Sequence, residues 1–424
     1  MQRSSPEVRR RGGADDAHDP AAGAKHDGVS VVRIIARLNV GGPAIHVLNL
    51  CRGQEAVYPT LLVTGQVDST EVDIRETRDH EGVRIANMGE LGRTISPWQD
   101  LRAFAKLYRL LRKVRPAIVH THTAKAGTLG RLAAVAARVP VRVHTFHGHV
   151  LDGYFSPLKS RLAVLIERLL AVVTTRLVTV SDLQARDLVN KFAICDADRM
   201  TVIPLGFDLS PFDADVVQSL RGQFREELGI AERAVIVTVG RLVPIKNHRL
   251  LLEAARELRR SGVTFALVIV GGGPEESALR QIARDLGVAD VVEFVGWRHD
   301  INRIYADADV VALSSINEGT PVCLIEALAA GCAVVSTDVG GVRDVLENGR
   351  LGTIVPSADP RALADGIRAL LEDVTARRRL GELGSVSVRQ RFGVERLVNE
   401  MNNLYDELLP KQKSTAKAPH PAQQ

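Results

Sequence analysis

Two glutamates, Glu318 and Glu326, stand eight residues apart on either side of a predicted helix start. Between them, Thr320 is a residue type that caps helices, and Pro321 suits the first helical position, where a missing N–H costs nothing. The segment from Val322 to Ala330 is apolar on nearly every side, which predicts a buried helix. Because a lone buried carboxylate is costly to remove from water, Glu326 needs a partner.

The first turn of this predicted helix is also an anion site. Backbone N–H groups at a helix start have no intrahelical partner, so those of Val322 and Cys323 attract negative groups. Side chains lean toward the helix N-terminus, which places Glu326 over the same turn. A sugar nucleotide fits this arrangement, because its diphosphate lies between two diols, and carboxylates bind hydroxyls strongly. Glu326 would hold the ribose and Glu318 the transferred sugar. The alternative is a plain strand–loop–helix unit with one surface glutamate and one satisfied core glutamate.

A pair of cations follows another predicted strand, Val235–Val239. Arg241 and Lys246 lie in the loop after it, and Asn247 is placed to cap the next helix. Two cations beside the positive end of a helix repel each other unless an anion lies among them. A diphosphate leaving group supplies that anion, and stabilising its developing charge is the main electrostatic task in glycosyl transfer. Solvated loop cations are the alternative for this loop taken alone.

The first predicted strand-to-helix turn contains Gly41 and Gly42, directly before Pro43. Two glycines permit a tight turn and a close approach of a ligand to the backbone. The spacing is not G-x-G-x-x-G, so the dinucleotide fingerprint is absent here and also at Gly271-Gly272-Gly273.

Five histidines follow two neighbouring predicted strands. We expect His147, beside Gly148, to be either a polar group at the floor of a cleft or a structural hydrogen-bonding residue. The spacing matches no established zinc pattern, and no carboxylate is adjacent, so no metal ligand is predicted. His120, His122 and His144 are predicted to be structural. No role is assigned to His149.

Three D-x-D triplets do not change this expectation. The most suggestive, Asp307-Ala308-Asp309, precedes the predicted strand Val310–Leu313 and therefore lies at the wrong end of it for a ligand. We predict surface acids at all three positions and no metal cofactor.

The elements that must position these residues alternate between strand and helix in two series. Such alternation predicts a parallel sheet with helices on both faces, here formed twice. In open parallel sheets, ligands bind beyond the carboxyl ends of the strands, where the residues above are found. The predicted strands of the first series are Val31–Ala36, Thr60–Val63, Ala117–His120, Val141–Phe146, Leu177–Val180 and Thr201–Ile203. Those of the second are Val235–Val239, Phe265–Val270, Val291–Phe294, Val310–Leu313, Ala333–Ser336 and Gly352–Val355.

Composition excludes several classes of protein. The 424 residues suffice for two full domains, and a net charge of +5 with 4% aromatic residues gives no basic-aromatic platform for nucleic acid. Four cysteines without C-x-x-C spacing favour a reducing cytoplasm. No apolar run is long enough to cross a bilayer, and the longest, from Leu162 to Val173, is interrupted by Glu167 and Arg168 and predicts a packed helix.

The motifs together resemble those of GT-B-fold retaining glycosyltransferases of family four. The resemblance rests on Arg241 with Lys246, on Glu318-Gly319-Thr320-Pro321, and on Glu326-Ala327. The turn at Gly41, the Phe146-His147-Gly148 segment and the Gly340-Gly341 turn are similar as well. The similarity extends from about residue 30 to 408, and the His144–His149 segment looks most like enzymes of surface-polysaccharide assembly.

This resemblance implies transfer of a sugar from a nucleotide sugar, most commonly a UDP-sugar, with retention of anomeric configuration and without a metal. It implies a lipid-linked or glycan acceptor, and an enzyme at the inner face of the membrane without a span. The basic tail that holds Lys411, Lys413 and Lys417 would attract anionic lipid. By the same resemblance Arg241 and Lys246 bind the diphosphate, with Gly41, Gly42, Gly319, Pro321 and Val322 completing the donor site, and His147 joins Glu318 at the reacting sugar.

We therefore expect five segments. Residues 1–28 are a disordered leader, 29–207 a Rossmann-like acceptor domain, and 208–390 a Rossmann-like nucleotide-sugar domain. Residues 391–409 form a helix that packs back toward the first domain, and 410–424 are a disordered basic tail. Alternative functions on this fold are a non-hydrolysing epimerase, a phosphorylase or a non-catalytic binding scaffold. A dinucleotide-dependent oxidoreductase is disfavoured by the missing fingerprint.

Overall fold

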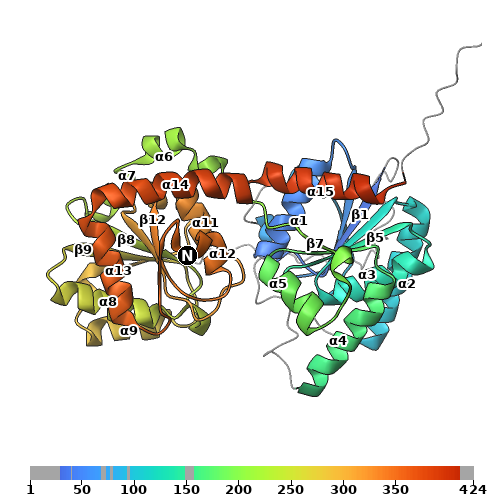
Figure 1. Cartoon of the computed structure of the whole chain (residues 1–424), viewed down its shortest axis with the longest axis horizontal. Helices are drawn as coiled ribbons and strands as arrows, with labels where there is room; N and C mark the ends of the chain where they lie inside the picture. Colours follow the sequence, from blue (N-terminus) through green and yellow to red (C-terminus); the bar gives the residue numbers. More distant parts are fainter. Residues whose placement is uncertain are drawn as a thin grey trace, which may run out of the picture.

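The computed structural model describes residues 29–39, 41–67, 73–76, 80–92, 96–148 and 157–410. They form two parallel β-sheets, each with helices on both faces, which confirms the predicted fold class of two Rossmann-like domains (Figure 1). The predicted leader, the basic tail and His149 lie outside the described residues.

The first sheet has seven strands in the order β3-β2-β1-β4-β5-β6-β7, all parallel. Its central strand β1 is buried along its whole length, as expected for an apolar run covered on both faces. The strands are β1 (Val31–Ile35), β2 (Thr60–Thr64), β3 (Arg84–Asn87), β4 (Ile118–His122), β5 (Val141–Phe146), β6 (Arg176–Thr179) and β7 (Met200–Val202). The α-helices are α1 (Gly42–Gln54), α2 (Pro97–Val114), α3 (Ala124–Ala136), α4 (Pro157–Val172) and α5 (Asp182–Arg186).

The second sheet has six parallel strands in the order β10-β9-β8-β11-β12-β13. The order reverses between β8 and β11, and such a switch point is where open parallel sheets bind ligands. The strands are β8 (Ala234–Val239), β9 (Phe265–Val270), β10 (Val292–Gly296), β11 (Val310–Leu313), β12 (Ala333–Thr337) and β13 (Thr353–Val355). The helices are α6 (Ala214–Leu220), α7 (Gln223–Leu228), α8 (His248–Arg260), α9 (Glu276–Asp285), α10 (Ile301–Ala306), α11 (Val322–Ala329), α12 (Val342–Val345) and α13 (Pro360–Glu372).

Two long helices connect the domains. Helix α14 (Val374–Phe392) packs on α11 of the second domain, and α15 (Val394–Leu408) packs on α1 of the first (Figure 1). The two chain crossings run side by side, because Phe207 donates its backbone N–H to the Phe392 carbonyl at 2.8 Å and accepts from Val394 at 2.9 Å. The chain therefore passes between the domains at one place.

Three expectations about elements need correction. Edge strand β3 was not predicted, because its four residues are too short and too exposed to give a periodic pattern. Helix α4 is not packed on its apolar side, since Leu162 and Leu169 are more than half exposed. Asp307 is not a surface acid. It is buried and accepts hydrogen bonds from the backbone N–H groups of Gly222, Phe224 and Arg225 at the start of α7.

None of the described helices combines the length and the apolar character needed to span a bilayer.

Candidate active site

The loops that follow β8 and β11 meet because these two strands are neighbours in the sheet. Lys246 in the first loop and Glu318 in the second form an ion pair, with Nζ and Oε1 2.6 Å apart. The Glu318 side chain is only 9% exposed and that of Lys246 is 22% exposed. Two predicted site residues that are 72 positions apart in the sequence are therefore in contact.

Further hydrogen bonds hold this pair in place. Ser315 donates its hydroxyl to the same Glu318 Oε1 at 2.5 Å. Ser314 donates to the Lys246 carbonyl at 3.1 Å, and the Ile316 N–H donates to the Ile245 carbonyl at 2.8 Å. The two loops are thus joined through backbone as well as side chains, which fixes the position of the carboxylate relative to the ammonium group.

The Gly340-Gly341 turn packs against the backbone of the Glu318 loop. A Cβ on Gly340 would lie 1.8 Å from the Glu318 carbonyl oxygen, and one on Gly341 would lie 1.9 Å from that of Gly319. The Gly341 N–H also donates to the Glu318 carbonyl at 3.1 Å. Only glycine fits at these two positions without a backbone shift, so the turn restrains the loop that carries Glu318.

Helix α11 begins at Val322, with Pro321 as its N-cap residue, one position later than predicted from Thr320. The helix is buried on most sides, but Glu326 is half-buried and not fully enclosed. Glu318 and Glu326 both act on the Cys323 thiol, whose pKa is raised to about 12 mainly by burial and further by these two carboxylates. Along the chain, Glu318 precedes the first turn of α11 and Glu326 follows its start by one turn.

Arg241 is exposed at the carboxyl end of β8, and no hydrogen bond or ion pair of its side chain occurs within the described part of the chain. Asn247 is the N-cap residue of α8, but its backbone is left-handed and its side chain makes no capping bond, contrary to our expectation. The cation pair is also not left unbalanced, since Lys246 already has Glu318 as its counter-ion. Arg241 is the member of the pair that remains available to an external anion.

On the first domain, three histidines gather at the carboxyl edge of the sheet. The ring of His122 at the end of β4 and that of His147 after β5 are hydrogen-bonded, Nδ1 to Nε2, at 2.9 Å. His46 from α1 lies edge-on to His147, with ring centroids 4.9 Å apart. Both nitrogens of His46, Nε2 of His122 and Nδ1 of His147 have no hydrogen-bond partner among the described residues. Buried groups of this kind are normally satisfied, so these nitrogens are available to a ligand.

Burial keeps this histidine cluster (His46, His122 and His147) neutral. It lowers the pKa of His147 to about 3 and lowers the pKa values of His46 and His122 well below the ordinary imidazole range. Neutral imidazoles are hydrogen-bonding groups and metal ligands, not cations.

The other two described histidines of the predicted set are structural, as expected. His120 bonds the Tyr405 hydroxyl at 2.6 Å and the Thr145 hydroxyl at 2.7 Å. His144 bonds the Thr121 hydroxyl at 2.8 Å. His122 differs from this expectation, because it belongs to the cluster with a free ring nitrogen.

The histidine cluster is also the one group of potential metal ligands in the described chain, with candidate ligand atoms within 4.8 Å of one another. Three imidazoles without a carboxylate suit Zn²⁺ but not Mg²⁺ or Mn²⁺, which prefer oxygen. Zinc coordination at about 2.0–2.1 Å would require the rings to approach and the bond between His122 and His147 to break. The donor set therefore does not match a metal that neutralises a diphosphate.

Gly41 and Gly42 lie beside this cluster in sequence, at the start of α1. Gly41 is the N-cap residue and is extended, and a Cβ on Gly42 would meet only a Leu205 methyl group at 3.6 Å. The turn forms where predicted, but neither glycine is required by its backbone angles or by a close protein neighbour.

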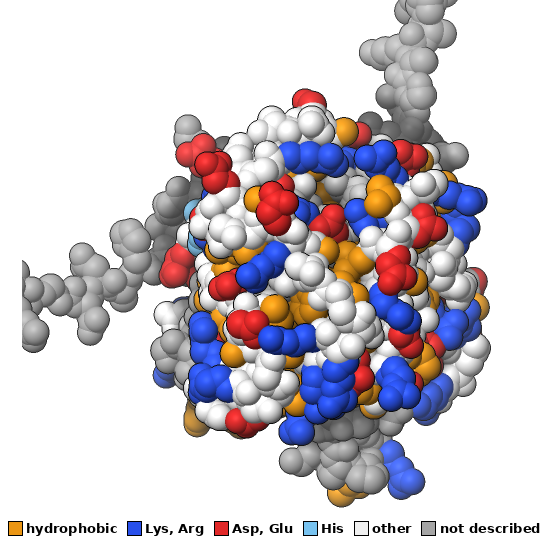
Figure 2. Space-filling view, turned by 90° about the vertical axis from the view of Figure 1, so that its left-hand side faces the viewer, with side chains coloured by type: hydrophobic (Ala, Val, Ile, Leu, Met, Phe, Trp, Pro, Cys, Tyr) orange, Lys and Arg blue, Asp and Glu red, His pale blue; other side chains and the backbone are white. Residues whose placement is uncertain are grey.

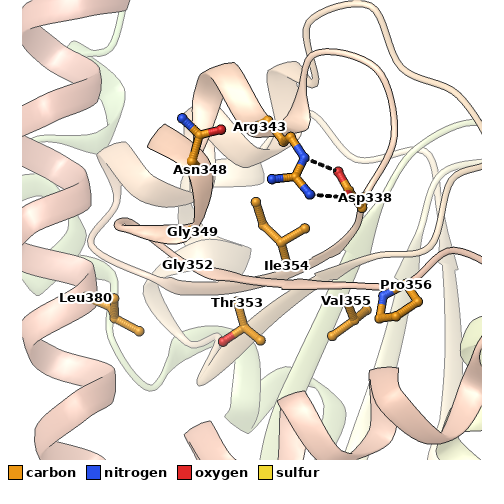
Figure 3. Close-up of a pocket in the computed structure, with 10 residues that line it drawn as sticks. All are labelled: Asp338, Arg343, Asn348, Gly349, Gly352, Thr353, Ile354, Val355, Pro356 and Leu380. Carbon is orange, nitrogen blue, oxygen red and sulfur yellow. Dashed lines mark hydrogen bonds and ion pairs between the residues drawn. The ribbon is translucent and has the colours of Figure 1, made fainter.

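Two cavities lie in the described part of the molecule, and neither is lined by the Lys246–Glu318 ion pair. The smaller, about 290 Å³, is lined by both domains, including Ser181 and Asp182 from the first and Thr320 and Gly341 from the second. The larger, about 620 Å³, lies in the second domain, where Arg343 points to Asp338 and bonds it at 2.5 Å (Figure 3). Arg343 lines both cavities. We place the site at the loops around Lys246 and Glu318 because the charged groups converge there.

Sequence reasoning missed His46 and Ser315. His46 lies four residues after Gly42 on the first turns of α1, and the predicted turn would have placed it at the carboxyl edge of the sheet. Ser315 is the second residue after β11, at the strand end where site residues of such sheets lie, but a serine there carries no distinctive signal.

Two family models match the chain, each over one domain. Residues 41–206 match the glycosyl transferase 4-like domain, and residues 221–385 match glycosyl transferases group 1. These boundaries enclose all the predicted site residues.

Three relatives illustrate the similarity. The UDP-Gal:alpha-D-GlcNAc-diphosphoundecaprenol alpha-1,3-galactosyltransferase of Escherichia coli is 29% identical, over 78% of this chain and 85% of its own. The D-inositol 3-phosphate glycosyltransferase of Xylanimonas cellulosilytica is 33% identical, over 68% of this chain and 71% of its own. The capsular polysaccharide biosynthesis glycosyltransferase CapM of Staphylococcus aureus is 25% identical, over 80% and 88%.

Solved structures share the fold. Anabaena HepE in complex with UDP superposes with a TM-score of 0.76 at 21% identity, covering 89% of this chain and 100% of HepE. A glycosyltransferase from Rickettsia africae superposes with a TM-score of 0.78 at 18% identity, covering 91% and 100%.

Proposed function

Since the chain belongs to the group 1 glycosyltransferases and has their two-domain GT-B fold, we propose that it transfers a sugar from a UDP-sugar to a lipid-linked acceptor, with retention of anomeric configuration. The observation that carries this proposal is the Lys246–Glu318 ion pair at the start of α11, with Arg241 exposed beside it. A cation, a carboxylate and free helix N–H groups converge there as a nucleoside diphosphate sugar requires.

We assign roles by position. Arg241 and Lys246 bind the diphosphate and stabilise the charge that develops on it as the glycosidic bond breaks. The first turn of α11, which begins at Val322, offers the N–H groups of Val322 and Cys323 to the same oxygens. Glu326 accepts hydrogen bonds from the ribose hydroxyls. On donor binding, Lys246 shares its charge between the diphosphate and Glu318, which leaves the carboxylate free to accept from a sugar hydroxyl.

His147 faces the reaction from the first domain. As a neutral imidazole with an unpartnered Nδ1, it is suited to hydrogen-bond an uncharged sugar hydroxyl and not a phosphate. Gly41 and Gly42 leave the space through which donor or acceptor approaches this edge.

The acceptor assignment is supported by two named relatives, one acting on a diphosphoundecaprenol-linked sugar and one in capsular polysaccharide biosynthesis. We place the enzyme accordingly in surface-polysaccharide assembly, at the inner face of the membrane. Product analysis tests the stereochemistry. An α-linked UDP-sugar should give an α-linked product by proton NMR, and a β-linked product would contradict retention.

Metal independence is part of the proposal. Asp307 and Asp309 are engaged in structural bonds at the opposite end of β11, and the histidine cluster does not suit a diphosphate-bound metal. Transfer should therefore survive excess EDTA. Loss of activity on chelation with recovery on Mg²⁺ or Mn²⁺ would contradict this part.

A thermal-shift panel of nucleotide sugars tests the donor class. A ligand that binds only the folded protein stabilises it by mass action and so raises the melting temperature. At a ligand concentration of one hundred times Kd, the added stability is about 2.7 kcal/mol. UDP-sugars should give the largest shift, and ADP- and GDP-sugars smaller ones. No shift with any nucleotide sugar would contradict the assignment.

A further inference from the structure

Helix α4 presents its apolar side to solvent. Along one face Leu158 is 78% exposed, Leu162 56%, Leu165 52%, Leu169 63% and Val172 74%. These residues recur every three or four positions, which places them on one stripe of a helix. A surface helix of a globular protein ordinarily buries such a stripe, whereas α4 exposes it to solvent.

The opposite face of α4 explains why the helix nevertheless holds its position. Glu167 points inward and forms a buried ion pair with Arg131 of α3, at 2.8 Å. Ala171 belongs to the buried core around β6, and the adjacent Leu170 is also buried. The helix is anchored through Glu167, Leu170 and Ala171, and the apolar residues of the opposite stripe stay exposed.

The neighbouring helices also expose large apolar residues. Helix α3 packs against both α2 and α4, and the three lie together on one side of the first domain (Figure 1). Trp98 at the start of α2 is 74% exposed and Leu101 57%, and Leu132 of α3 is 44% exposed. Isolated exposed apolar residues are ordinary, but a set on three adjacent helices marks an interaction surface.

The three helices carry an excess of positive charge. Their acidic residues in the sequence are Asp100 and Glu167, and both are neutralised, by Lys125 at 2.7 Å and by Arg131. Exposed cations remain at Arg102, Arg109, Arg112 and Arg161. The end of the second domain differs, because Figure 2 shows cationic and acidic side chains interspersed across it. An apolar surface with exposed cations and no unpaired helix carboxylate is complementary to an anionic lipid surface.

We propose that the α2–α4 face docks on the anionic surface of a bilayer, with the α4 leucines entering the boundary between headgroups and acyl chains. A second copy of the chain fits less well, because two such faces would bring like charges together. The inference rests on the proposed function insofar as it gives a reason for docking, a lipid-linked acceptor. Helix α3 begins two residues after His122, so this helix connects the docking face with the sheet edge that holds the histidine cluster.

Vesicle flotation of the full chain tests the proposal. The probes are vesicles of phosphatidylcholine alone and with about a third phosphatidylglycerol, in the range where basic residues sense surface charge. We expect the parent to bind the anionic vesicles at least tenfold more strongly than the neutral ones. The double variant Leu165→Gln/Leu169→Gln should lose at least tenfold in partitioning, and Arg109→Gln/Arg112→Gln about as much on anionic vesicles only.

Val57→Gln/Val386→Gln is the matched control, because both residues are about as exposed as the α4 leucines and lie outside the face. It should bind vesicles like the parent. Equal partitioning of the α4 variant and the parent would overturn the proposal, whether binding comes from the basic tail or is absent. So would a parent dimer in sedimentation that the α4 variant abolishes without any vesicle binding.

Two further readouts separate this inference from the proposed function. UDP binding and the melting temperature should be unchanged in the α4 variant, which shows that the site and the fold are intact. Transfer to a short-chain, water-soluble acceptor should stay within twofold of the parent, whereas transfer to a long-chain acceptor in vesicles should fall at least tenfold. A parent that binds vesicles but neither UDP nor any UDP-sugar would overturn the proposed function and leave the docking surface standing.

Discussion

At the scale of single residues, the ion pair between Lys246 and Glu318 is the feature on which the chemistry depends. Their approach to 2.6 Å joins two motifs that the sequence separates by 72 positions. The residue types and the strand-end location of each motif were predictable, because polar groups after parallel strands gather at one edge of the sheet. That Glu318 would already neutralise Lys246 was not predictable, since it depends on the side-chain geometry of two loops.

We expect Lys246→Ala to lower kcat/KM at least tenfold, about 1.4 kcal/mol in transition-state stabilisation, because the leaving diphosphate loses a cation. Steady-state kinetics with a UDP-sugar measures this. Arg249→Ala is the control, since that cation lies on the adjoining helix α8, is exposed and pairs with Glu253. Unchanged kcat/KM in the lysine variant would remove Lys246 from the donor site.

The buried histidines predict a dependence of stability on pH. Burial lowers the pKa of His147 to about 3, and those of His46, His120, His122 and His144 also fall well below their ordinary value. The unfolded chain therefore binds more protons than the folded one below about pH 6.5, so stability is full above that pH and is lost as pH falls through it.

For each such histidine, the free energy of unfolding falls by about 1.4 kcal/mol as the pH is lowered from about 7.5 to about 5.5. The melting temperature should therefore drop steeply over this range, as followed by calorimetry. His122→Asn removes one titrating group and should reduce the slope. A melting temperature that is flat or rises toward pH 5.5 would show that the imidazoles are accessible to protons in the folded state.

At the scale of elements, α15 is bound to the first domain by a buried polar network. The Tyr405 hydroxyl accepts from Arg33 Nη2 at 2.8 Å and bonds His120 Nδ1 at 2.6 Å. Gln54 of α1 donates its side-chain amide to Asn402 of α15 at 2.6 Å. The hydroxyl thus joins β1 and β4 of the first sheet to α15, which lies far from both in the sequence.

Tyr405→Phe should lower the melting temperature by about 5 °C. Removing the hydroxyl leaves His120 Nδ1 without its partner and takes one acceptor from Arg33 Nη2, which costs on the order of 2 kcal/mol. A domain of roughly 150–250 residues loses about 2–4 °C per kcal/mol. Tyr108→Phe on α2 is the control, because that ring is 37% exposed, and it should melt like the parent. Equal melting of both variants would mean that the network contributes nothing to stability.

Elements also show where sequence reasoning failed. Apolar runs at the centre of each sheet were predictable, because strands buried on both faces are apolar throughout. Helix α4 has the same apolar content as a packed helix, and nothing in its periodicity says that the leucine stripe faces outward. That orientation follows from the ion pair between Glu167 and Arg131, a tertiary contact.

At the scale of the whole molecule, two parallel-sheet domains were predictable from the two series of alternating strands and helices. The alternation alone does not predict how their functional edges face each other, because that depends on where the chain crosses between the domains; only the resemblance to the GT-B fold implied it. The crossings at Phe207 and Phe392 lie side by side, and a cavity of about 290 Å³ near them is lined from both domains. Donor groups of the second domain and the histidine cluster of the first thus belong to two halves of one proposed site.

The measurement that tests the donor site most directly is isothermal titration calorimetry of UDP with Glu326→Gln and Glu318→Gln. UDP retains the ribose and the diphosphate but lacks the sugar, so it separates the two carboxylates. Glu326→Gln should weaken UDP binding at least tenfold, because the ribose hydroxyls lose a charged acceptor. Glu318→Gln should bind UDP like the parent or more tightly, since Lys246 loses its competing counter-ion. The exposed Glu382→Gln on α14 serves as the control. Parent-like UDP binding by both variants, or exchanged behaviour of the two, would contradict the proposed donor site.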